Sequence, residues 1–179
     1  MFWQIALENS ATSIWQGHPR LIPLNNLGWT FEWVIQALLE REYHALVRRH
    51  VILGEVRALG EIDVLALFAN GQSLLIECKS SSKGLTDRQL DRFVAKAQGF
   101  PATYAFLIID TDDFHQMQQR LGQFGQAMMR AFGDGSVGPI QHHAGSNVVC
   151  LRRNLYVADT GGEIISSLQA ILTKDADLP

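Results

Sequence analysis

One segment limits the possible folds of this chain more than any other: residues 60–82, GEIDVLALFANGQSLLIECKSSS. It contains two apolar runs separated by an Asn-Gly pair, which predicts two β-strands joined by a short turn. Strands that are apolar on both faces belong in a sheet covered on both sides, where a charged group is costly unless it is paired, binds a metal or takes part in catalysis. Three charged residues nevertheless lie inside these strands: Asp63, Glu77 and Lys79.

The spacing of the second strand adds chemistry to this pattern. Glu77 and Lys79 are two residues apart, so they share one face of a strand, while Cys78 points to the other face. An acid and a cation on one face, with Asp63 on the neighbouring strand, can hold Mg²⁺ and an attacking water side by side. The simpler alternative is an ion pair of Lys79 with Glu77 or Glu61 at the end of a sheet.

The two strands carry a family resemblance. GEIDVLAL followed by LLIECKSS resembles the PD-(D/E)xK nuclease superfamily, most closely its restriction-endonuclease-like and Holliday-junction-resolvase-like branch. Asp63 matches the motif aspartate, and Glu77-Cys78-Lys79 matches (D/E)xK. Ile62 stands where the family often has proline. The resemblance implies an α/β fold with a restriction-endonuclease-like core, in which a mixed central β-sheet is flanked by helices.

The same resemblance implies a function. It covers roughly residues 28–110 and predicts a Mg²⁺-dependent deoxyribonuclease that hydrolyses phosphodiester bonds. Asp63, Glu77 and the backbone carbonyl of Cys78 would bind the metal, Mg²⁺ or Mn²⁺, because both ions prefer oxygen ligands. Lys79 would orient the water or stabilise charge on the phosphate. The alternative is a nuclease-fold protein that binds nucleic acid or partner proteins without cleaving.

A helix is predicted from Thr30, as its N-cap, to about Arg48. The superfamily often carries a glutamate on its first helix, in a pair like Phe31-Glu32, so the resemblance makes Glu32 a further active-site carboxylate beside Asp63 and Glu77. Helical periodicity singles out Glu42 instead, because it falls near the middle of the apolar stripe.

Basic residues that follow the second strand are candidates for DNA contacts. A polar loop with one lysine comes directly after Lys79, and Thr86 with Gln89 forms a capping-box pattern that opens a helix. Three cations recur every four residues along that helix, which predicts either an outer stripe that binds the DNA backbone or, equally, ordinary solvated surface. The predicted nucleic-acid contacts are Lys83, Arg88, Arg92 and Lys96.

The other expected elements complete an α/β order with a mixed sheet. A first strand is expected at Val51–Arg57, a buried strand at Ala102–Ile109, a helix after Asp113, short strands at Val148–Leu151 and Leu155–Val157, and a final helix at Glu163–Leu172.

Composition places the chain among globular proteins. Its 179 residues suit one nuclease-like domain, 28–179, with an N-terminal appendage, 1–27, as a lid or dimer contact. The net charge of −3 disfavours a protein that coats nucleic acid indiscriminately. Two cysteines and no membrane-spanning or leader pattern predict a cytoplasmic protein. The sequence leaves the oligomeric state open, although many members of the superfamily that it resembles act as homodimers.

The turn between the two central strands decides whether the site can exist. A two-residue turn would put Asp63 and Glu77 on opposite faces of the sheet. A three-residue loop, 69–71, pairs Phe68 with Gln72 and brings Asp63 across from Glu77. The last residue of that loop is a glycine, which can adopt the left-handed conformation that such a loop requires. The sequence therefore predicts the three-residue loop.

Overall fold

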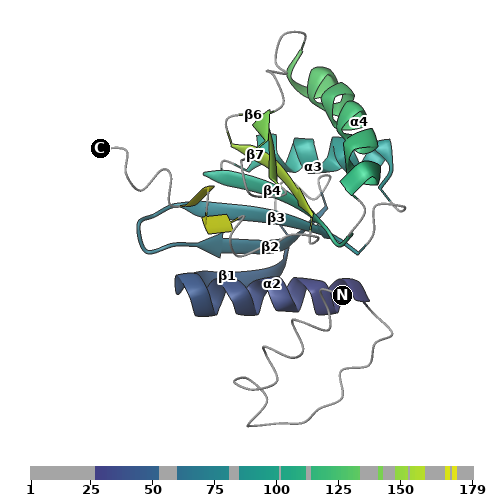
Figure 1. Cartoon of the computed structure of the whole chain (residues 1–179). Helices are drawn as coiled ribbons and strands as arrows, with labels where there is room; N and C mark the ends of the chain where they lie inside the picture. The colour runs from purple at the N-terminus through teal and green to yellow at the C-terminus, as the bar shows by residue number, and fades with distance from the viewer. Residues whose placement is uncertain are drawn as a thin grey trace.

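The protein is an α/β structure built around a mixed sheet flanked by helices (Figure 1). In the part of the chain that the structure describes, the sheet has seven strands in the order β1-β2-β3-β4-β7-β6-β5. The computed structural model describes residues 27–52, 60–80, 85–100, 102–111, 114–133, 141–142, 148–152, 154–159, 168–169 and 171–172. The N-terminal appendage predicted at 1–27 and the loop residue Lys83 thus lie outside the described residues, apart from Leu27 itself.

Helix α2 (Leu27–Tyr43) begins and ends earlier than predicted. Thr30 is inside the helix rather than its N-cap, and the last turn does not reach Arg48. The helix ends because His44 adopts a left-handed backbone conformation (φ 51°), after which the chain enters strand β1 (Leu46–Ile52). The prediction of a first strand at Val51–Arg57 was therefore wrong in its start, since Leu46 continued the helical spacing of apolar residues without belonging to the helix.

The central hairpin has the predicted register. Strand β2 (Glu61–Leu67) pairs antiparallel with β3 (Ser73–Lys79), from Val64 opposite Ile76 to the ends of the two strands at the loop. Phe68 and Gln72 close a three-residue loop through a backbone hydrogen bond of 2.9 Å. Gly71 sits in the left-handed region (φ 83°), as expected for the last residue of this loop.

The next elements follow the sequence pattern closely. Helix α3 (Asp87–Gly99) opens with the predicted capping box of Thr86 and Gln89. Strand β4 (Tyr104–Ile109) is fully buried and parallel to β3, as a strand after a crossover helix should be. Helix α4 (Phe114–Phe132) packs against α3 and buries Phe124 and Met128.

The last strands extend the sheet beyond β4. Strand β7 (Leu155–Asp159) is parallel to β4, and β6 (Val148–Arg152) returns antiparallel beside β7. A short strand β5 (Gln141–His142) pairs antiparallel with β6. Of the predicted last helix, residues 168–169 and 171–172 are described, and they are helical.

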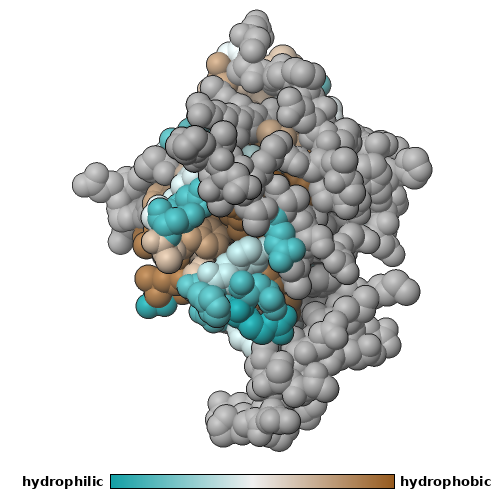
Figure 2. Space-filling model, turned by 60° about the vertical axis from the view of Figure 1, so that its left-hand side comes forward, coloured by the Kyte–Doolittle hydropathy of each residue, from teal (hydrophilic) through white to brown (hydrophobic). Residues whose placement is uncertain are grey.

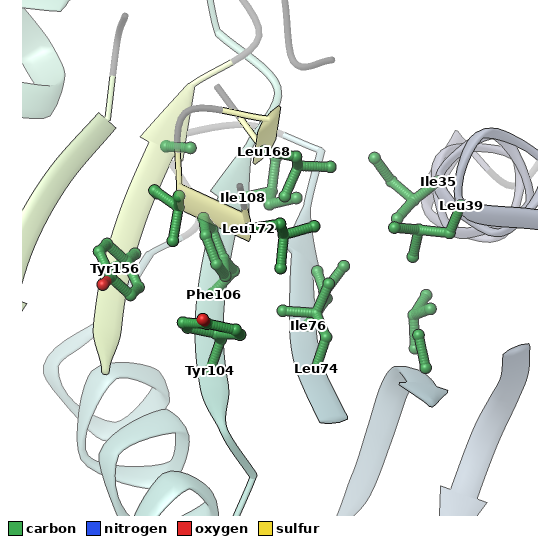
Figure 3. Packing of buried hydrophobic residues seen from close by; sticks show 14 of the residues in the cluster. Ile35, Leu39, Leu74, Ile76, Tyr104, Phe106, Ile108, Tyr156, Leu168 and Leu172 are labelled. Atoms are coloured by element: carbon green, nitrogen blue, oxygen red, sulfur yellow. The ribbon is translucent and has the colours of Figure 1, made fainter. Parts of the chain in front are cut away.

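Two hydrophobic clusters lie on the two faces of the sheet. Ile35 and Leu39 of α2 point toward Leu74 and Ile76 of β3 on one face, where Leu168 and Leu172 also pack (Figure 3). The opposite face is covered by α3 and α4, whose apolar residues form the second cluster (Figure 1). The members of this cluster from the two helices include Leu90, Phe93, Val94, Phe124, Ala127 and Met128.

The loop end of the hairpin exposes apolar side chains. Leu46 and Leu67 are cross-strand partners and are 59% and 48% exposed. Figure 2 shows hydrophobic side chains next to hydrophilic ones on the side of the molecule where this hairpin comes forward. None of the helices within the described ranges is long and apolar enough to cross a membrane.

Candidate active site

The predicted catalytic residues of β2 and β3 meet at one end of the sheet. The Lys79 ammonium lies 2.8 Å from Glu77 Oε1 and 3.9 Å from Asp63 Oδ2, so one cation lies within reach of both carboxylates. All three side chains are at most 20% exposed. The three residues therefore lie together as predicted, and the ion pair of Lys79 with Glu77, which was the simpler alternative, is present as well.

Asp63 is held by the backbone of the neighbouring strand. The Cys78 amide donates a hydrogen bond of 2.8 Å to Asp63 Oδ2, next to the point where the regular β2–β3 ladder ends at Val64 and Ile76. The carboxylate thus takes the place of a main-chain acceptor for that amide. Burial, followed by the nearby Glu77 carboxylate, raises the pKa of Asp63 to about 6.

At this point of the sheet, strands β1 and β2 reverse which of their side chains face α2 and which face α3. Ile62 belongs to the cluster beneath α3, whereas Val64 belongs to the cluster beneath α2, although residues two apart in a regular strand share a face. On β1 the change falls at His50, which has a left-handed backbone (φ 56°) and lies between residues paired with Val64 and Ile62. This reversal lets side chains from both faces of the sheet reach one site.

Glu32 comes to the site from α2, on the other side of the sheet from α3. It is 8% exposed, and its Oε2 lies 3.3 Å from His50 Nε2 but has no hydrogen-bond partner within the described part of the chain. Burial, followed by the Asp63 carboxylate, raises the pKa of Glu32 to about 7. Glu42, the alternative from periodicity, is exposed and pairs with Arg41, because it lies in the last turn of the helix.

Lys96 does not lie where the sequence placed it. It was expected on the outer stripe of α3 with Arg88 and Arg92, which are indeed exposed, but Lys96 is only 5% exposed. Its ammonium donates to Glu77 Oε2 at 2.5 Å and to the backbone carbonyl of Glu61. The prediction that Lys96 lies on the outer stripe was therefore wrong, because its side chain points into the site, whereas its contact with DNA stays a prediction.

His50 is the second site residue that sequence reasoning missed. Its Nδ1 contacts the Glu61 carboxylate while its Nε2 faces Glu32, so the ring bridges two acids at the edge of the site. Its position opposite Asp63 is visible only once β1 is known to start at Leu46. Without that boundary, nothing in the sequence marked a histidine just before the predicted strand as a site residue.

The charges of the cluster are nearly balanced around Glu77. Burial alone would lower the pKa of Lys79, but the Glu77 and Asp63 carboxylates outweigh it and hold the pKa above its ordinary value. Lys79 is thus available as an ammonium group. Burial also raises the pKa of the Cys78 thiol well above its usual range, which leaves the thiol protonated and unsuited to bind a hard cation.

The donor set fits a hydrated Mg²⁺ better than a metal held by protein alone. Within the described ranges, no three His, Cys, Asp or Glu side chains come together in a way that could hold a metal ion. Two carboxylates, those of Asp63 and Glu77, nevertheless lie near one cation, which is the Lys79 ammonium. Mg²⁺ usually binds through one or two carboxylates and keeps several waters, so the two carboxylates here match the number that such an ion takes from a protein.

Comparison with known proteins adds no identification. No protein-family model matches the chain, and no curated protein matches it significantly.

Proposed function

We propose that this chain is a Mg²⁺-dependent deoxyribonuclease with a restriction-endonuclease-like core, which hydrolyses phosphodiester bonds at the Asp63, Glu77 and Lys79 site. The observation that carries the proposal is the position of the Lys79 ammonium, within 4 Å of two buried carboxylates on adjacent strands. Buried acids that repel each other are costly, and such clusters are typical of sites that bind a cation or perform chemistry.

Each residue of the cluster has a role that its contacts support. Asp63 and Glu77, with the Cys78 carbonyl, would hold the Mg²⁺, whose chemistry when bound is to withdraw charge from a phosphate oxygen and make a water more acidic. The Cys78 amide orients the Asp63 carboxylate. Lys79 can donate hydrogen bonds to a water or a phosphate oxygen. Glu32, with a pKa of about 7, can accept or release a proton near neutral pH.

The DNA would approach across the exposed side of α3. Arg88 and Arg92 lie on that side and are both exposed. Only a local basic surface of this kind can attract DNA to a chain whose net charge is −3. The proposal leaves the oligomeric state open between a monomer and a homodimer.

A second function is favoured by one observation. Each Glu77 oxygen accepts from a lysine, so this carboxylate is satisfied without any metal. A protein that binds nucleic acid or a partner protein without cleaving would keep such a site as a structural ion-pair cluster.

A cleavage assay separates the two functions. The full chain is incubated with linear duplex, nicked, branched and single-stranded DNA, with Mg²⁺ and in parallel with a chelator. A nuclease cuts at least one substrate with Mg²⁺ and none with the chelator. Retained DNA binding without cleavage, in both Mg²⁺ and Mn²⁺, would instead support the non-cleaving protein.

A further inference from the structure

Glu77 has an ammonium group on each of its carboxylate oxygens. Lys79 donates to Oε1 at 2.8 Å and Lys96 donates to Oε2 at 2.5 Å. A metal ion bound to one of these oxygens would bring its charge close to the ammonium group there, so the two cations would compete for that oxygen. The two lysines differ in how firmly the protein holds them, and that difference indicates which one moves.

Lys96 is the fixed member of the pair. Its side chain is 6% exposed, and its ammonium has a second partner in the Glu61 carbonyl at the start of β2. It belongs to a helix whose N-terminus is closed by a capping box and whose Phe93 and Val94 are fully buried in the core. Moving Lys96 would break both contacts of a buried ammonium, which is costly.

Lys79 is the member that can leave. It is the last residue of β3, and its side chain is more exposed than that of Lys96, at 20%. Among the described residues its close contact is with Glu77, since Asp63 Oδ2 is 3.9 Å away. A long, flexible side chain at a strand end can reach water without disturbing the core.

We propose that the two lysines have different roles at Glu77. Lys79 is an internal counter-cation that fills the space between Asp63 and Glu77 until Mg²⁺ binds. Lys96 is a positioning residue that keeps Glu77 in place throughout. The inference rests on the proposed function, because it assumes that Mg²⁺ binds to these carboxylates. In the metal-free protein the two lysines balance the charges of Asp63 and Glu77, which avoids an uncompensated buried charge. Once displaced, the Lys79 ammonium is free to contact a substrate phosphate.

Amine labelling of the full chain tests the exchange directly. Acetic anhydride acylates accessible, unprotonated amines, and mass spectrometry reports the modification of each lysine. Without Mg²⁺, both Lys79 and Lys96 should be protected by their contacts with Glu77. With Mg²⁺, labelling of Lys79 should rise several-fold while Lys96 stays protected, because only Lys79 leaves its partner.

The Lys96→Gln protein tests the positioning role. Without its firm contact Glu77 can rotate, so Lys79 should be labelled even without Mg²⁺. The matched control is Arg92→Gln, an exposed residue on the same helix, which should leave Lys79 protected. Thermal unfolding of both variants checks that they are folded. A folded Lys96→Gln protein in which Lys79 stays protected until Mg²⁺ is added would contradict the positioning role.

Calorimetric Mg²⁺ titration separates this inference from the proposed function. Lys79→Gln should bind Mg²⁺ several-fold more tightly than the parent, because the competing cation is gone. If the parent binds Mg²⁺ but Lys79 labelling and the affinity of Lys79→Gln are both unchanged, the exchange is wrong and the proposed nuclease is unaffected. If the parent binds no Mg²⁺, the exchange and the metal-dependent function are both wrong.

Discussion

At the scale of single residues, the site is defined by acids that the protein holds in unfavourable surroundings. Glu32 and Asp63 both have raised pKa values, of about 7 and about 6, and in both cases burial is the main cause. Such shifts lower the free energy of unfolding at neutral pH, and a purely structural cluster has no reason to keep acids that destabilise the fold. They are consistent with a site whose acids serve a bound cation or a proton transfer.

The raised pKa of Glu32 predicts how the stability of the metal-free protein changes with pH. A carboxyl whose pKa is higher in the folded state than in the unfolded state favours folding at low pH. This contribution is complete below the unfolded pKa and is lost as pH rises from about 4 to about 7. The loss is on the order of 3–4 kcal/mol, since the pKa rises from 4.5 to about 7 and each pKa unit corresponds to about 1.4 kcal/mol. Chemical denaturation at a series of pH values measures it.

Glu32→Gln should remove this part of the pH dependence. The variant should be more stable than the parent at pH 7.5 and should lose less stability between pH 4 and pH 7. Glu42→Gln is the matched control, because Glu42 is exposed on the same helix. If the two variants have the same pH profile as the parent, the environment assigned to Glu32 is wrong. In DNA cleavage, the Glu32 variant should be the more strongly impaired of the two.

At the scale of elements, helix α3 presents two kinds of basic residue. Arg88 and Arg92 are exposed, whereas Lys96 is turned into the site. Residues four apart on a helix are offset by about 40°, so three such residues span about 80°, and the last of them reaches the margin of the buried face. The stripe seen in the sequence is therefore one pair of surface arginines and one site lysine.

Replacing both surface arginines should weaken DNA binding in a salt-dependent way. If Arg88 and Arg92 each contact a phosphate, the double change to Gln should reduce the slope of log affinity against log salt by up to about two counterions. Fluorescence anisotropy with a duplex at several salt concentrations measures the slope. Arg130→Gln is a suitable control, because Arg130 is paired with Asp91. An unchanged slope in the double variant would show that the two arginines are ordinary solvated surface residues without phosphate contacts.

The central hairpin depends on Gly71. A residue with a side chain is strained at φ 83°, although no atom lies within 4 Å of the position where a Cβ would be placed. Gly71→Ala should therefore destabilise the protein by about 1 kcal/mol through backbone conformation alone. Gly122→Ala, in helix α4 with the same free space, should instead stabilise it by about 0.5–1 kcal/mol. Equal effects of the two changes in thermal unfolding would contradict the turn.

The sequence predicted the hairpin well because two independent signals agreed. The parity of Asp63 and Glu77 required an odd loop, and the glycine at its end suited the left-handed position. The end of α2 was predicted too late, because Leu46 continues the helical spacing of apolar residues although the left-handed backbone at His44 ends the helix. Lys96 and His50 were missed because each reaches the site only through the tertiary arrangement, which periodicity within one element does not report.

At the scale of the whole molecule, the sheet gathers the site from both of its faces. Glu32 comes from α2 on one face, and Lys96 comes from α3 on the other (Figure 1). They reach the same end of the sheet because β1 and β2 both reverse the faces to which their side chains point, at His50 and Asp63. The α/β class and the mixed sheet followed from the order of the elements, whereas this reversal had no counterpart in the alternation of apolar residues.

The central claim is that Asp63 belongs to a metal-dependent catalytic site. The most direct measurement is the rate of Mg²⁺-dependent DNA cleavage by the parent and by Asp63→Asn, with thermal unfolding to show that both are folded. The asparagine keeps an oxygen that can accept from the Cys78 amide but lacks the charge that binds the metal. The account predicts that the folded variant loses cleavage entirely. A folded Asp63→Asn protein that cuts DNA as fast as the parent would contradict it.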